Sequence, residues 1–445
     1  MRRRAFLGLA GGALAAAGAE APRPNIVLAM ADDQGWGDTS YNGHPYLRTP
    51  VLDEMARTGI RFDRFYSGAP VCSPTRGSCL TGRHPYRYGV FFANADSGTD
   101  APSKYALPER EYTIAELLKP YGYTAGHFGK WHLGDFAGPM KSSPVDNGFD
   151  EFFSTTRKVP TVDPDGYWTK DGRIAGVIAG DDSRILMDRA LAFIEGAVQT
   201  KKPFCAVIWF HAPHEPVAAT EEHRRPYRAH GEKEQHFYGA IAAVDEQMGR
   251  LRETLRRLGV RDNTMLWYAS DNGPEGDALT AASPGRPGPF RGRKRSLFEG
   301  GVRVPGLLEW PARFAKPQVI STPASTSDYV PTVLAALGLK PPSTDGMDGI
   351  DLMPILTKKR LKRNLPIAFE TMGNTRGSPK LAWIEERWKL LTDLDGGEEM
   401  LFDLAADENE TVNLAAKHPE QCERMRGLLK AWRASCSRSR SGLVR

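Results

Sequence analysis

The chain has 445 residues, of which 40% are hydrophobic and 25% are charged, as in an ordinary globular protein of two or three structural units. This length excludes a peptide hormone and a small binding module, and the 45 glycines and 33 prolines indicate many long loops. The formal net charge is +5, and it falls by two when the three arginines and one glutamate of the first 21 residues are left out. The positive charge that remains is too small for nucleic-acid binding by charge alone.

The first 21 residues have the pattern of an export signal. Residues 2–7 read Arg-Arg-Arg-Ala-Phe-Leu, a small-residue apolar stretch follows, and residues 19–21 (Ala-Glu-Ala) have the spacing of a cleavage site, which together resemble a twin-arginine signal. The apolar run at residues 5–19 is shorter than the ~18 residues that span a bilayer, and no later segment reaches that length. We expect a soluble chain exported to the periplasm or beyond, with an uncleaved membrane tether as the alternative.

From residue 25 onward, strand patterns alternate with helix patterns. An apolar run at residues 25–31 is typical of a buried strand that presents acids at its C-terminal end. Residues 49–59 carry the cap, first-turn proline and terminal glycine of a helix, and Thr113 with Glu116 forms a capping box for another. Further strands are predicted at residues 61–66, 123–128, 204–210 and 265–269, and further helices at residues 183–194 and 235–258.

This alternation predicts an α/β fold with a mainly parallel sheet flanked by helices. In such sheets ligands bind beyond the carboxyl ends of the strands. Six polar residues directly follow strand-like runs, and we expect them to meet at that edge: Asp32, Asp33, His211, His214, Asp271 and Asn272.

The texture changes near residue 365. Four short strands are predicted at residues 367–370, 381–384, 388–391 and 400–404, followed by a helix at residues 419–432. We therefore expect a catalytic domain at residues 22–364 and a small C-terminal subdomain, an antiparallel sheet with one packed helix, at residues 365–445. Three arginines near the end, Arg438, Arg440 and Arg445, are interpreted as a frayed terminus, with a polyanion site as the alternative.

The five cysteines are an odd number without metal-ligand spacing, which disfavours a disulfide framework or a zinc site. One of them, Cys72, begins the segment Cys-Ser-Pro-Thr-Arg, which resembles the signature of the type I, arylsulfatase-like sulfatases. The resemblance implies that a separate formylglycine-generating enzyme reads the Cys-x-Pro-x-Arg pattern and oxidises Cys72 to formylglycine. The alternative is an inert thiol beside a turn proline.

An aldehyde suits this chemistry because an ordinary serine would be left as a stable sulfate ester. A hydrated aldehyde carries two hydroxyls on one carbon, so one hydroxyl attacks sulfur and the other then loses its proton, expels sulfate and restores the aldehyde. Export of an already folded chain is compatible with modification and metal loading of Cys72 in the cytoplasm.

The adjacent acids Asp32 and Asp33 would repel each other unless a cation neutralises them, and their hard oxygen ligands favour calcium or magnesium. Taken alone, such a pair is more often a solvated turn. The resemblance implies that Asp271 and Asn272 complete a calcium site held against residue 72. The neighbouring Asp38 is interpreted as a cap of the loop that follows it, with a role as a further metal ligand as the alternative.

Three further motifs complete the resemblance. Residues 129–134 (Gly-Lys-Trp-His-Leu-Gly) imply that Lys130 binds sulfate and that His132 lies beside the formylglycine. Residues 211–216 (His-Ala-Pro-His-Glu-Pro) supply a histidine that binds sulfate and protonates the leaving group, a task suited to a pKa near 6.5; we favour His214 over His211.

The third motif places a second sulfate-contacting lysine at Lys294. The sequence departs from the family here, because relatives often have glycine where Arg293 and Arg295 stand. We interpret these arginines as solvated surface charges, with an extension of the site toward a polyanionic substrate as the alternative. In the signature itself, Arg76 is expected to hold the formylglycine hydrate and the calcium carboxylates in place.

The resemblance covers nearly all of residues 25–404. It implies the alkaline-phosphatase-like α/β fold and hydrolysis of sulfate esters, which we expect to be sulfated carbohydrates, with long loops at residues 90–108 and 154–182 shaping subsites and aryl sulfates as convenient test compounds. The alternatives are a phosphoesterase or phosphonate monoester hydrolase of the same superfamily, and a non-catalytic binder of sulfated glycans. No nucleic acid and no stable membrane span is expected.

Overall fold

The computed structural model describes residues 23–93, 106–276, 283–341, 346–372, 377–394 and 397–442. The predicted signal at residues 1–21, part of the predicted loop at residues 90–108, and Arg445 lie outside the described residues. Over the described ranges, no helix is long and apolar enough to cross a membrane.

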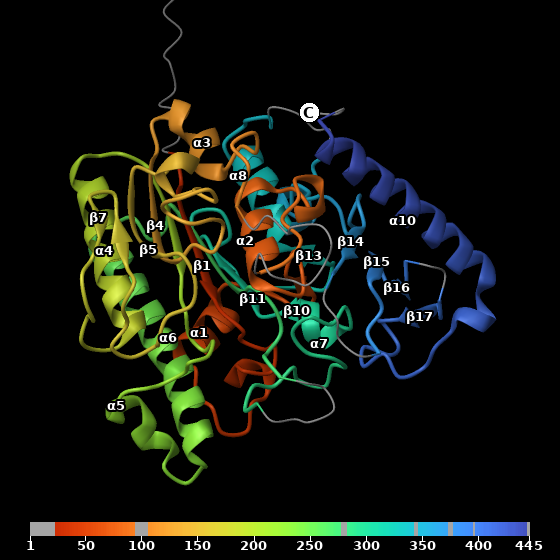
Figure 1. Cartoon of the computed structure of the whole chain (residues 1–445), viewed down its shortest axis with the longest axis horizontal. Helices are drawn as coiled ribbons and strands as arrows, with labels where there is room; N and C mark the ends of the chain where they lie inside the picture. The colour runs from red at the N-terminus through yellow and green to blue at the C-terminus, as the bar shows by residue number, and fades with distance from the viewer. Residues whose placement is uncertain are drawn as a thin grey trace, which may run out of the picture.

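A ten-stranded sheet forms the centre of the molecule (Figure 1). Its strands are β1 (Asn25–Ala31), β2 (Ile60–Phe62), β4 (Thr124–Lys130), β5 (Glu151–Thr155), β6 (Trp168–Thr169), β7 (Gly172–Arg173), β8 (Phe204–Trp209), β9 (Thr264–Ser270), β11 (Gly306–Glu309) and β12 (Gln318–Ile320). They lie in the order β12-β2-β11-β9-β1-β8-β4-β5-β6-β7. The five neighbours from β9 to β5 are parallel, so their carboxyl ends share one edge of the sheet.

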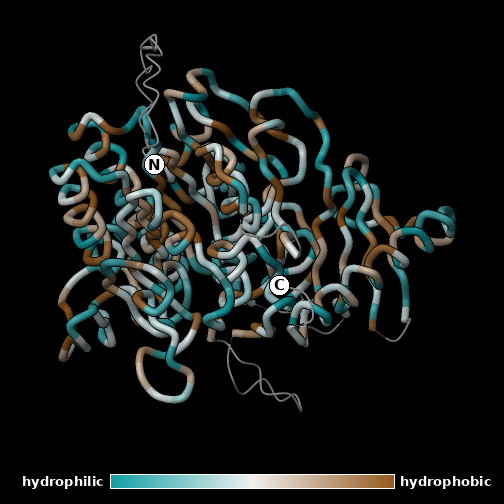
Figure 2. Tube along the Cα trace, turned by 90° about the horizontal axis from the view of Figure 1, so that it is seen from above, coloured by the Kyte–Doolittle hydropathy of each residue, from teal (hydrophilic) through white to brown (hydrophobic). Residues whose placement is uncertain are grey.

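Helices cover both faces of this sheet because alternate residues of its strands point to opposite sides. On one face Val27 and Ala29 pack with α1 (Pro50–Thr58), α4 (Asp182–Gln199) and α6 (Glu232–Arg257). On the other face Ile26 and Leu28 share a core with α2 (Cys72–Thr81), α3 (Ile114–Leu118), α8 (Tyr329–Ala336) and α9 (Met353–Leu356). Figure 2 shows brown hydrophobic segments gathered in the interior of the molecule, with much of the teal in outer turns.

Several short helices join the larger elements. They are η1 (Ser40–Asn42), η2 (Pro85–Arg87), η3 (Lys119–Tyr121), η4 (Val145–Asn147), α5 (Glu221–Arg224), η5 (Arg225–Tyr227), α7 (Glu299–Val302), η6 (Thr326–Asp328) and η7 (Ala415–Lys417). A three-stranded sheet beside the main one has the order β10-β3-β13 and consists of β3 (Phe65–Tyr66), β10 (Arg303–Val304) and β13 (Ala324–Ser325).

The C-terminal part is a four-stranded antiparallel sheet with one long helix, seen in blue at the side of Figure 1. Its elements are β14 (Ile367–Glu370), β15 (Leu381–Glu385), β16 (Trp388–Thr392), β17 (Met400–Asp403) and α10 (Pro419–Arg440). One face packs Leu390 against Met425 of α10. The other face packs Phe402 against Phe298, which joins this sheet to the segment around α7.

The predicted fold class is confirmed, including the antiparallel C-terminal sheet and the capping box of Thr113 and Glu116. The single strand predicted at residues 61–66 is wrong: residues 63 and 64 interrupt it, and its halves join different sheets, as β2 and β3. The strands predicted at residues 25–31 and 367–370 coincide with β1 and β14, and the other predicted strands differ from the observed ones by one or two residues at an end. The helix predicted at residues 183–194 is longer at both ends, as α4, and the one predicted at residues 235–258 begins three residues earlier and ends one residue earlier, as α6. The domain boundary at residue 365 stays a prediction.

The interpretation of the last arginines as a frayed terminus is wrong for Arg438 and Arg440. Both lie in α10, which continues well past the predicted end at residue 432. The Arg440 guanidinium donates to the Tyr86 carbonyl at 3.1 Å, so the helix is anchored by a contact that the tail's composition does not reveal.

Candidate active site

The predicted site residues meet at the carboxyl edge of the central parallel strands. Asp32 and Asp33 follow β1, and Cys72 is the first residue of α2. The Cys72 Sγ lies 3.4 Å from Asp32 Oδ1 and 4.0 Å from Asp33 Oδ1. With His214, these residues place four potential metal-ligand atoms within 4.8 Å of one another.

The ends of β1 and β9 are tied together at this edge. The Asp33 backbone N–H donates to Asp271 Oδ1 at 3.0 Å, and the Asp271 N–H donates to the Ala31 carbonyl at 3.1 Å. Asp33 and His132 have φ of 65° and 54°, in the left-handed region that non-glycine residues rarely adopt. Such strain persists where the surrounding structure holds it, and it clusters at functional sites.

Arg76 is fully buried beneath the acids. Its Nη2 lies 2.7 Å from Asp271 Oδ2 and 3.3 Å from Asp32 Oδ2, and its Nη1 donates to the Lys130 carbonyl at 2.8 Å. The guanidinium also lies over the Trp209 ring, 5.1 Å from its centroid. Arg76 therefore connects the ends of β1, β4 and β9, while its role in holding the formylglycine hydrate stays a prediction.

Two buried ammonium groups face the two adjacent acids. Lys130 Nζ lies 2.5 Å from Asp32 Oδ2, and Lys294 Nζ lies 2.7 Å from Asp33 Oδ2. Burial raises the pKa of Asp32, but the charges of Lys130 and its cationic neighbours outweigh it and hold the pKa well below the usual value. Burial likewise lowers the pKa of Lys294, yet the negative charge of Asp33 shifts it well above the ordinary range.

The acid and amide that follow β9 have the properties of cation ligands. Burial and the charge of Asp32 raise the pKa of Asp271 to about 7. The Asn272 Nδ2 donates to Asp33 Oδ1 at 2.6 Å, whereas its Oδ1 is buried and has no hydrogen-bond partner in the described structure. An oxygen without a partner beside three carboxylates fits a hard divalent cation, because buried polar atoms otherwise require a hydrogen bond.

The unmodified Cys72 thiol is a poor nucleophile in these surroundings. Burial, followed by the negative charges of Asp271 and Asp32, raises its pKa well above the ordinary value. The thiolate is the reactive form, so at neutral pH this thiol stays protonated. All five cysteines are buried and free of disulfides.

The two histidines of the 211–216 motif occupy different places. His211 is fully buried, with Nδ1 2.8 Å from Asp182 Oδ2 and Nε2 2.7 Å from Thr155 Oγ1. His214 instead reaches the acids, with Nε2 3.5 Å from Asp33 Oδ2 and a side chain that is 14% exposed. Burial lowers the pKa of His214 to about 4.

His132 is buried at the same edge, two residues beyond β4. Its pKa is lowered well below the ordinary value, first by burial and then by the positive charges of Lys130 and Arg76. The imidazole is therefore neutral at physiological pH and is suited to hydrogen bonding rather than to carrying charge.

The prediction that Asp38 caps the loop that follows it is wrong. Its carboxylate is fully buried and accepts from the backbone N–H of Gly35 at 2.9 Å and of Arg286 at 2.8 Å, because the 283–288 segment folds back over the preceding turn. Burial raises its pKa to about 8.

Arg293 and Arg295 are not free surface charges either. Arg293 donates to the backbone carbonyls of Glu275 and Gly285, and Arg295 forms a two-pronged ion pair with the Glu275 carboxylate. Sequence reasoning missed Glu275, as it missed Asp182 and Thr155. All three act through partners distant in sequence, although Glu275 does directly extend the Asp-Asn-Gly-Pro segment.

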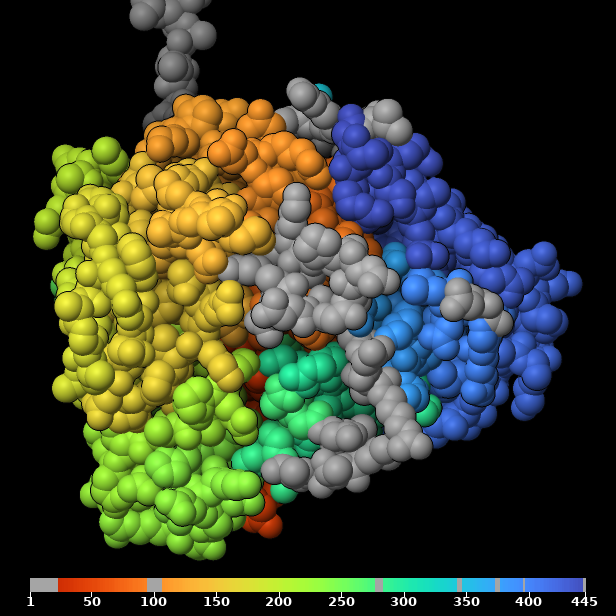
Figure 3. All heavy atoms as spheres, in the orientation of Figure 1, coloured from red at the N-terminus to blue at the C-terminus, as the bar shows by residue number. Residues whose placement is uncertain are grey.

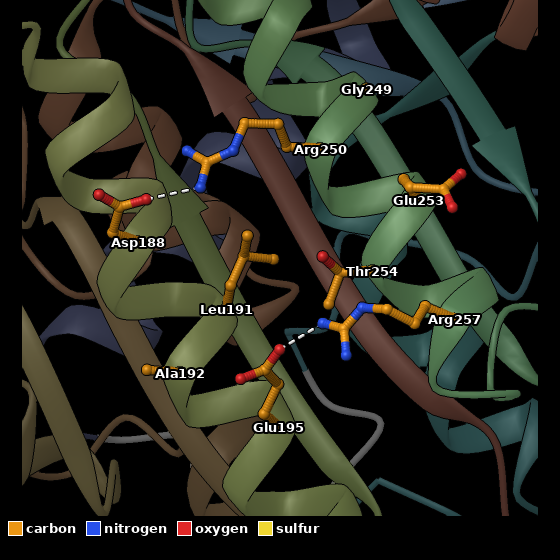
Figure 4. A pocket seen from close by; sticks show the side chains of 9 residues that line it. All are labelled: Asp188, Leu191, Ala192, Glu195, Gly249, Arg250, Glu253, Thr254 and Arg257. Carbon is orange, nitrogen blue, oxygen red and sulfur yellow. Dashed lines mark hydrogen bonds and ion pairs between the residues drawn. The ribbon is translucent and has the colours of Figure 1, made fainter.

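Figure 3 shows a hollow where yellow, green and teal segments meet, with red N-terminal atoms at its floor. A separate pocket of about 590 Å³ lies between α4 and α6 (Figure 4). Its arginines are paired, Arg250 with Asp188 at 2.7 Å and Arg257 with Glu195, and its lining contains none of the predicted site residues.

A family model described as Sulfatase matches residues 24–339, most of the chain. The chain belongs to the type I sulfatase family. A second model, described as N-sulphoglucosamine sulphohydrolase, C-terminal, matches residues 290–433 of this sulfatase. The resemblance deduced from the motifs is thereby confirmed, and so is the expected activity at its coarser level: this sulfatase is an enzyme that hydrolyses sulfate esters.

Named relatives agree with this assignment. The sulfatase is 36% identical over 384 residues to N-acetylgalactosamine-6-sulfatase of Mus musculus, covering 81% of its own chain and 71% of the relative, and 32% identical to arylsulfatase G of the same organism, covering 76% and 70%. Its fold matches the crystal structure of Ps i-CgsB in complex with k-i-k-neocarrahexaose with a TM-score of 0.82, 26% identity and 93% coverage of both chains.

Proposed function

We propose that this sulfatase hydrolyses sulfate esters of carbohydrates with a formylglycine formed from Cys72 and with calcium bound beside it. The observation that carries the proposal is the position of Cys72. Its side chain lies at the start of α2 among two buried carboxylates, and a lysine faces each of these carboxylates. The unmodified thiol is unreactive there, whereas the Cys-x-Pro-x-Arg segment supplies the pattern for its oxidation.

Calcium would be held by Asp32, Asp33, Asp271, Asn272 and the modified residue 72. These side chains fit a hard cation because their ligand atoms are oxygens and the buried Asn272 Oδ1 lacks a hydrogen-bond partner among the described residues. When bound, the ion supplies positive charge that neutralises the carboxylates and polarises the sulfate oxygens.

The chain's own cations bind and orient the sulfate group. Lys130 and Lys294 point into the same acidic cluster, and each ammonium can bind an oxygen of a sulfate group placed beside residue 72. Arg76 stays below, where its contacts with Asp271 and Asp32 hold the carboxylates in place. Fixed charges of this kind can be worth about 3 to 4 kcal/mol each in other enzymes.

His214 is the residue that we assign to proton donation. Its Nε2 faces Asp33 at 3.5 Å, close enough to the cluster to reach the oxygen that leaves with the sugar. Burial lowers its pKa to about 4 in the free protein. A bound anionic sulfate would raise that pKa, because a nearby negative charge favours the imidazolium. His132 supports the site as a neutral hydrogen-bonding group.

Two likenesses support sulfated carbohydrates as substrates. One relative is named for a sulfatase activity on N-acetylgalactosamine-6-sulfate, and the matched crystal structure contains an oligosaccharide. The sulfatase would therefore accept a sulfated sugar residue, and aryl sulfates would serve as simple surrogates.

The experiment uses protein co-expressed with a formylglycine-generating enzyme and loaded with calcium. Aryl sulfate, aryl phosphate and a panel of sulfated monosaccharides and disaccharides are assayed side by side. The proposal expects turnover of sulfate esters, with kcat/KM highest for a sulfated sugar. Preferential hydrolysis of the phosphate would favour a phosphoesterase, and binding of sulfated sugars without turnover would favour the non-catalytic binder.

We also propose that residues 1–21 direct export of the folded protein by a twin-arginine route. The support is the run of three arginines, the short apolar stretch and the Ala-Glu-Ala cleavage pattern. N-terminal sequencing of protein recovered from the periplasm is expected to begin near Pro22, and replacement of Arg2, Arg3 and Arg4 by lysine is expected to retain the precursor in the cytoplasm. Unchanged export of that variant would contradict this route.

A further inference from the structure

Three consecutive basic residues beside the site all contact Glu275, which lies three residues after Asn272. Glu275 Oε2 lies 3.3 Å from Lys294 Nζ, and its two carboxylate oxygens accept from Arg295 at 2.6 and 2.9 Å. Its backbone carbonyl accepts from Arg293 Nη1 at 2.8 Å. Burial opposes ionisation, but the Arg295 hydrogen bonds and the Lys294 charge hold the pKa of Glu275 well below its usual value, so the group is a carboxylate.

Lys294 lies between the carboxylates of Asp33 and Glu275, which differ in their other contacts. Asp33, at 2.7 Å, belongs to the cluster proposed to hold calcium, so its oxygens would be shared with the cation when calcium is bound. Glu275 lies outside that cluster, so its carboxylate would stay available to the ammonium with calcium bound to Asp33. A lysine side chain has a flexible four-carbon stem and about 2 kcal/mol of rotamer entropy. A carboxylate in a fixed position therefore restricts where its ammonium group lies.

Arg295 adds an unusual backbone to this arrangement. Its φ of 74° lies in the left-handed region that suits glycine and that other residues rarely adopt. The conformation places its N–H on the Pro70 carbonyl at 2.8 Å, while the Lys294 N–H donates to the Pro274 carbonyl at 3.1 Å. The strain is offset by the two-pronged pair with Glu275, a geometry that gives strong charge-assisted hydrogen bonds.

The charges of Glu275 and Arg295 also balance. The side chains of Lys294, Glu275 and Arg295 are 5%, 26% and 37% exposed, so the series runs from the buried site to its rim. Arg295 neutralises Glu275 from the solvent side. The positive charge of Lys294 therefore remains available for a sulfate oxygen.

We propose that Glu275 is a positioning residue that fixes the Lys294 ammonium at the sulfate-binding site, with Arg295 as its counter-ion and loop anchor. The inference rests on the proposed function, because it assumes that Lys294 binds sulfate. It assigns Glu275 no contact with substrate.

The test compares Glu275→Gln with the parent in calcium-loaded protein carrying formylglycine. Loss of the carboxylate is expected to lower kcat/KM for a sulfate ester by about tenfold or more, since one charge-assisted hydrogen bond is lost, and to raise the Kd for inorganic sulfate by about tenfold in calorimetric titration. Glu275→Asp keeps the charge on a shorter stem and is expected to recover part of both losses.

A matched control is Glu370→Gln in β14, because Glu370 forms a similar two-pronged pair with Arg433 at 2.9 and 2.9 Å in the small sheet. Its sulfate Kd is expected to equal that of the parent. The inference is overturned if Glu275→Gln binds sulfate and turns over like the parent. The inference is also overturned if the loss of sulfate binding in Glu275→Gln and Glu275→Asp is proportional to a fall in their melting temperatures, because a loss of stability would then explain it. The same loss of sulfate binding in Glu370→Gln would overturn it as well. A parent enzyme without sulfate-ester turnover would instead contradict the proposed function.

Discussion

Lys130 Nζ lies 2.5 Å from Asp32 Oδ2, in a pair whose side chains are 1% and 0% exposed. Replacing Lys130 by methionine keeps the stem and removes the charge. We expect kcat/KM for sulfate esters to fall by about 100-fold or more, because a fixed charge at the reacting group is lost. Leaving a buried carboxylate without this partner is also expected to destabilise the metal-free protein by about 3 kcal/mol in urea unfolding.

The control for this substitution is Lys141→Met. Lys141 pairs with Asp146 at 3.3 Å, but its side chain is 55% exposed, so the pair is screened by solvent. We expect its turnover and unfolding free energy to stay close to those of the parent. Wild-type turnover in Lys130→Met would contradict the role given to this lysine.

The different surroundings of His211 and His214 predict two different losses. His214→Gln is expected to fold normally and to lose more activity on substrates with poor leaving groups than on activated aryl sulfates, because proton donation matters less for a good leaving group. His211→Gln disrupts contacts with Asp182 and Thr155, so its main effect is expected to be a lower melting temperature and not a direct loss of activity. An equal loss of activity on substrates with poor and with good leaving groups in His214→Gln would contradict the assignment of His214 as the general acid.

Removal of calcium is expected to abolish turnover and to lower the melting temperature, since three adjacent acids then lose their shared cation. Titrating calcium back into chelator-treated protein should stabilise the fold by about 2.7 kcal/mol at 100 times the Kd. Asn272→Ala is expected to shift the calcium titration to higher concentration. Full activity in protein shown to be metal-free by elemental analysis would contradict the metal assignment.

A buried charge cluster joins α7 to the small C-terminal sheet. Lys389 Nζ lies 2.8 Å from Glu299 Oε1 and 2.9 Å from Glu410 Oε1, and the three side chains are fully buried. Burial, aided by the charge of Glu299, raises the pKa of Glu410 to about 7 from 4.5. The folded protein therefore binds a proton between these pH values that the unfolded chain releases.

The contribution of Glu410 to stability is complete below about pH 4.5 and is lost as pH rises through 7. The difference is on the order of 3 to 4 kcal/mol, since the pKa rises from 4.5 to about 7 and one pKa unit corresponds to about 1.4 kcal/mol. Glu410→Gln should flatten the dependence of the unfolding free energy between pH 5 and 7, measured by urea unfolding. A variant that retains the full slope would show that another group is responsible.

Local signals in the sequence predict the parts of the fold that depend on local interactions. The capping box of Thr113 and Glu116 and the acids after the strand at residues 25–31 stand where their neighbours dictate. The break between β2 and β3 could not be predicted, because both halves are buried strands and only pairing with distant segments separates them.

The same limit applies to the site. Asp32, Cys72 and Lys130 could be placed because each stands in a distinctive motif. The Glu275 contacts with Lys294 and Arg295 depend on two loops about 20 residues apart. The positive φ of Arg295 could not be predicted either, because arginine rarely adopts it. The sequence therefore favoured solvated arginines, whereas the structure pairs them.

The most direct measurement is the intact mass of the tryptic peptide that contains residue 72, taken from active enzyme purified from a host with a formylglycine-generating enzyme. We expect an aldehyde mass at Cys72, in a fraction that rises in proportion to specific activity, and no turnover in Cys72→Ala. A wholly unmodified thiol in fully active protein, or undiminished turnover in Cys72→Ala, would contradict the proposed function.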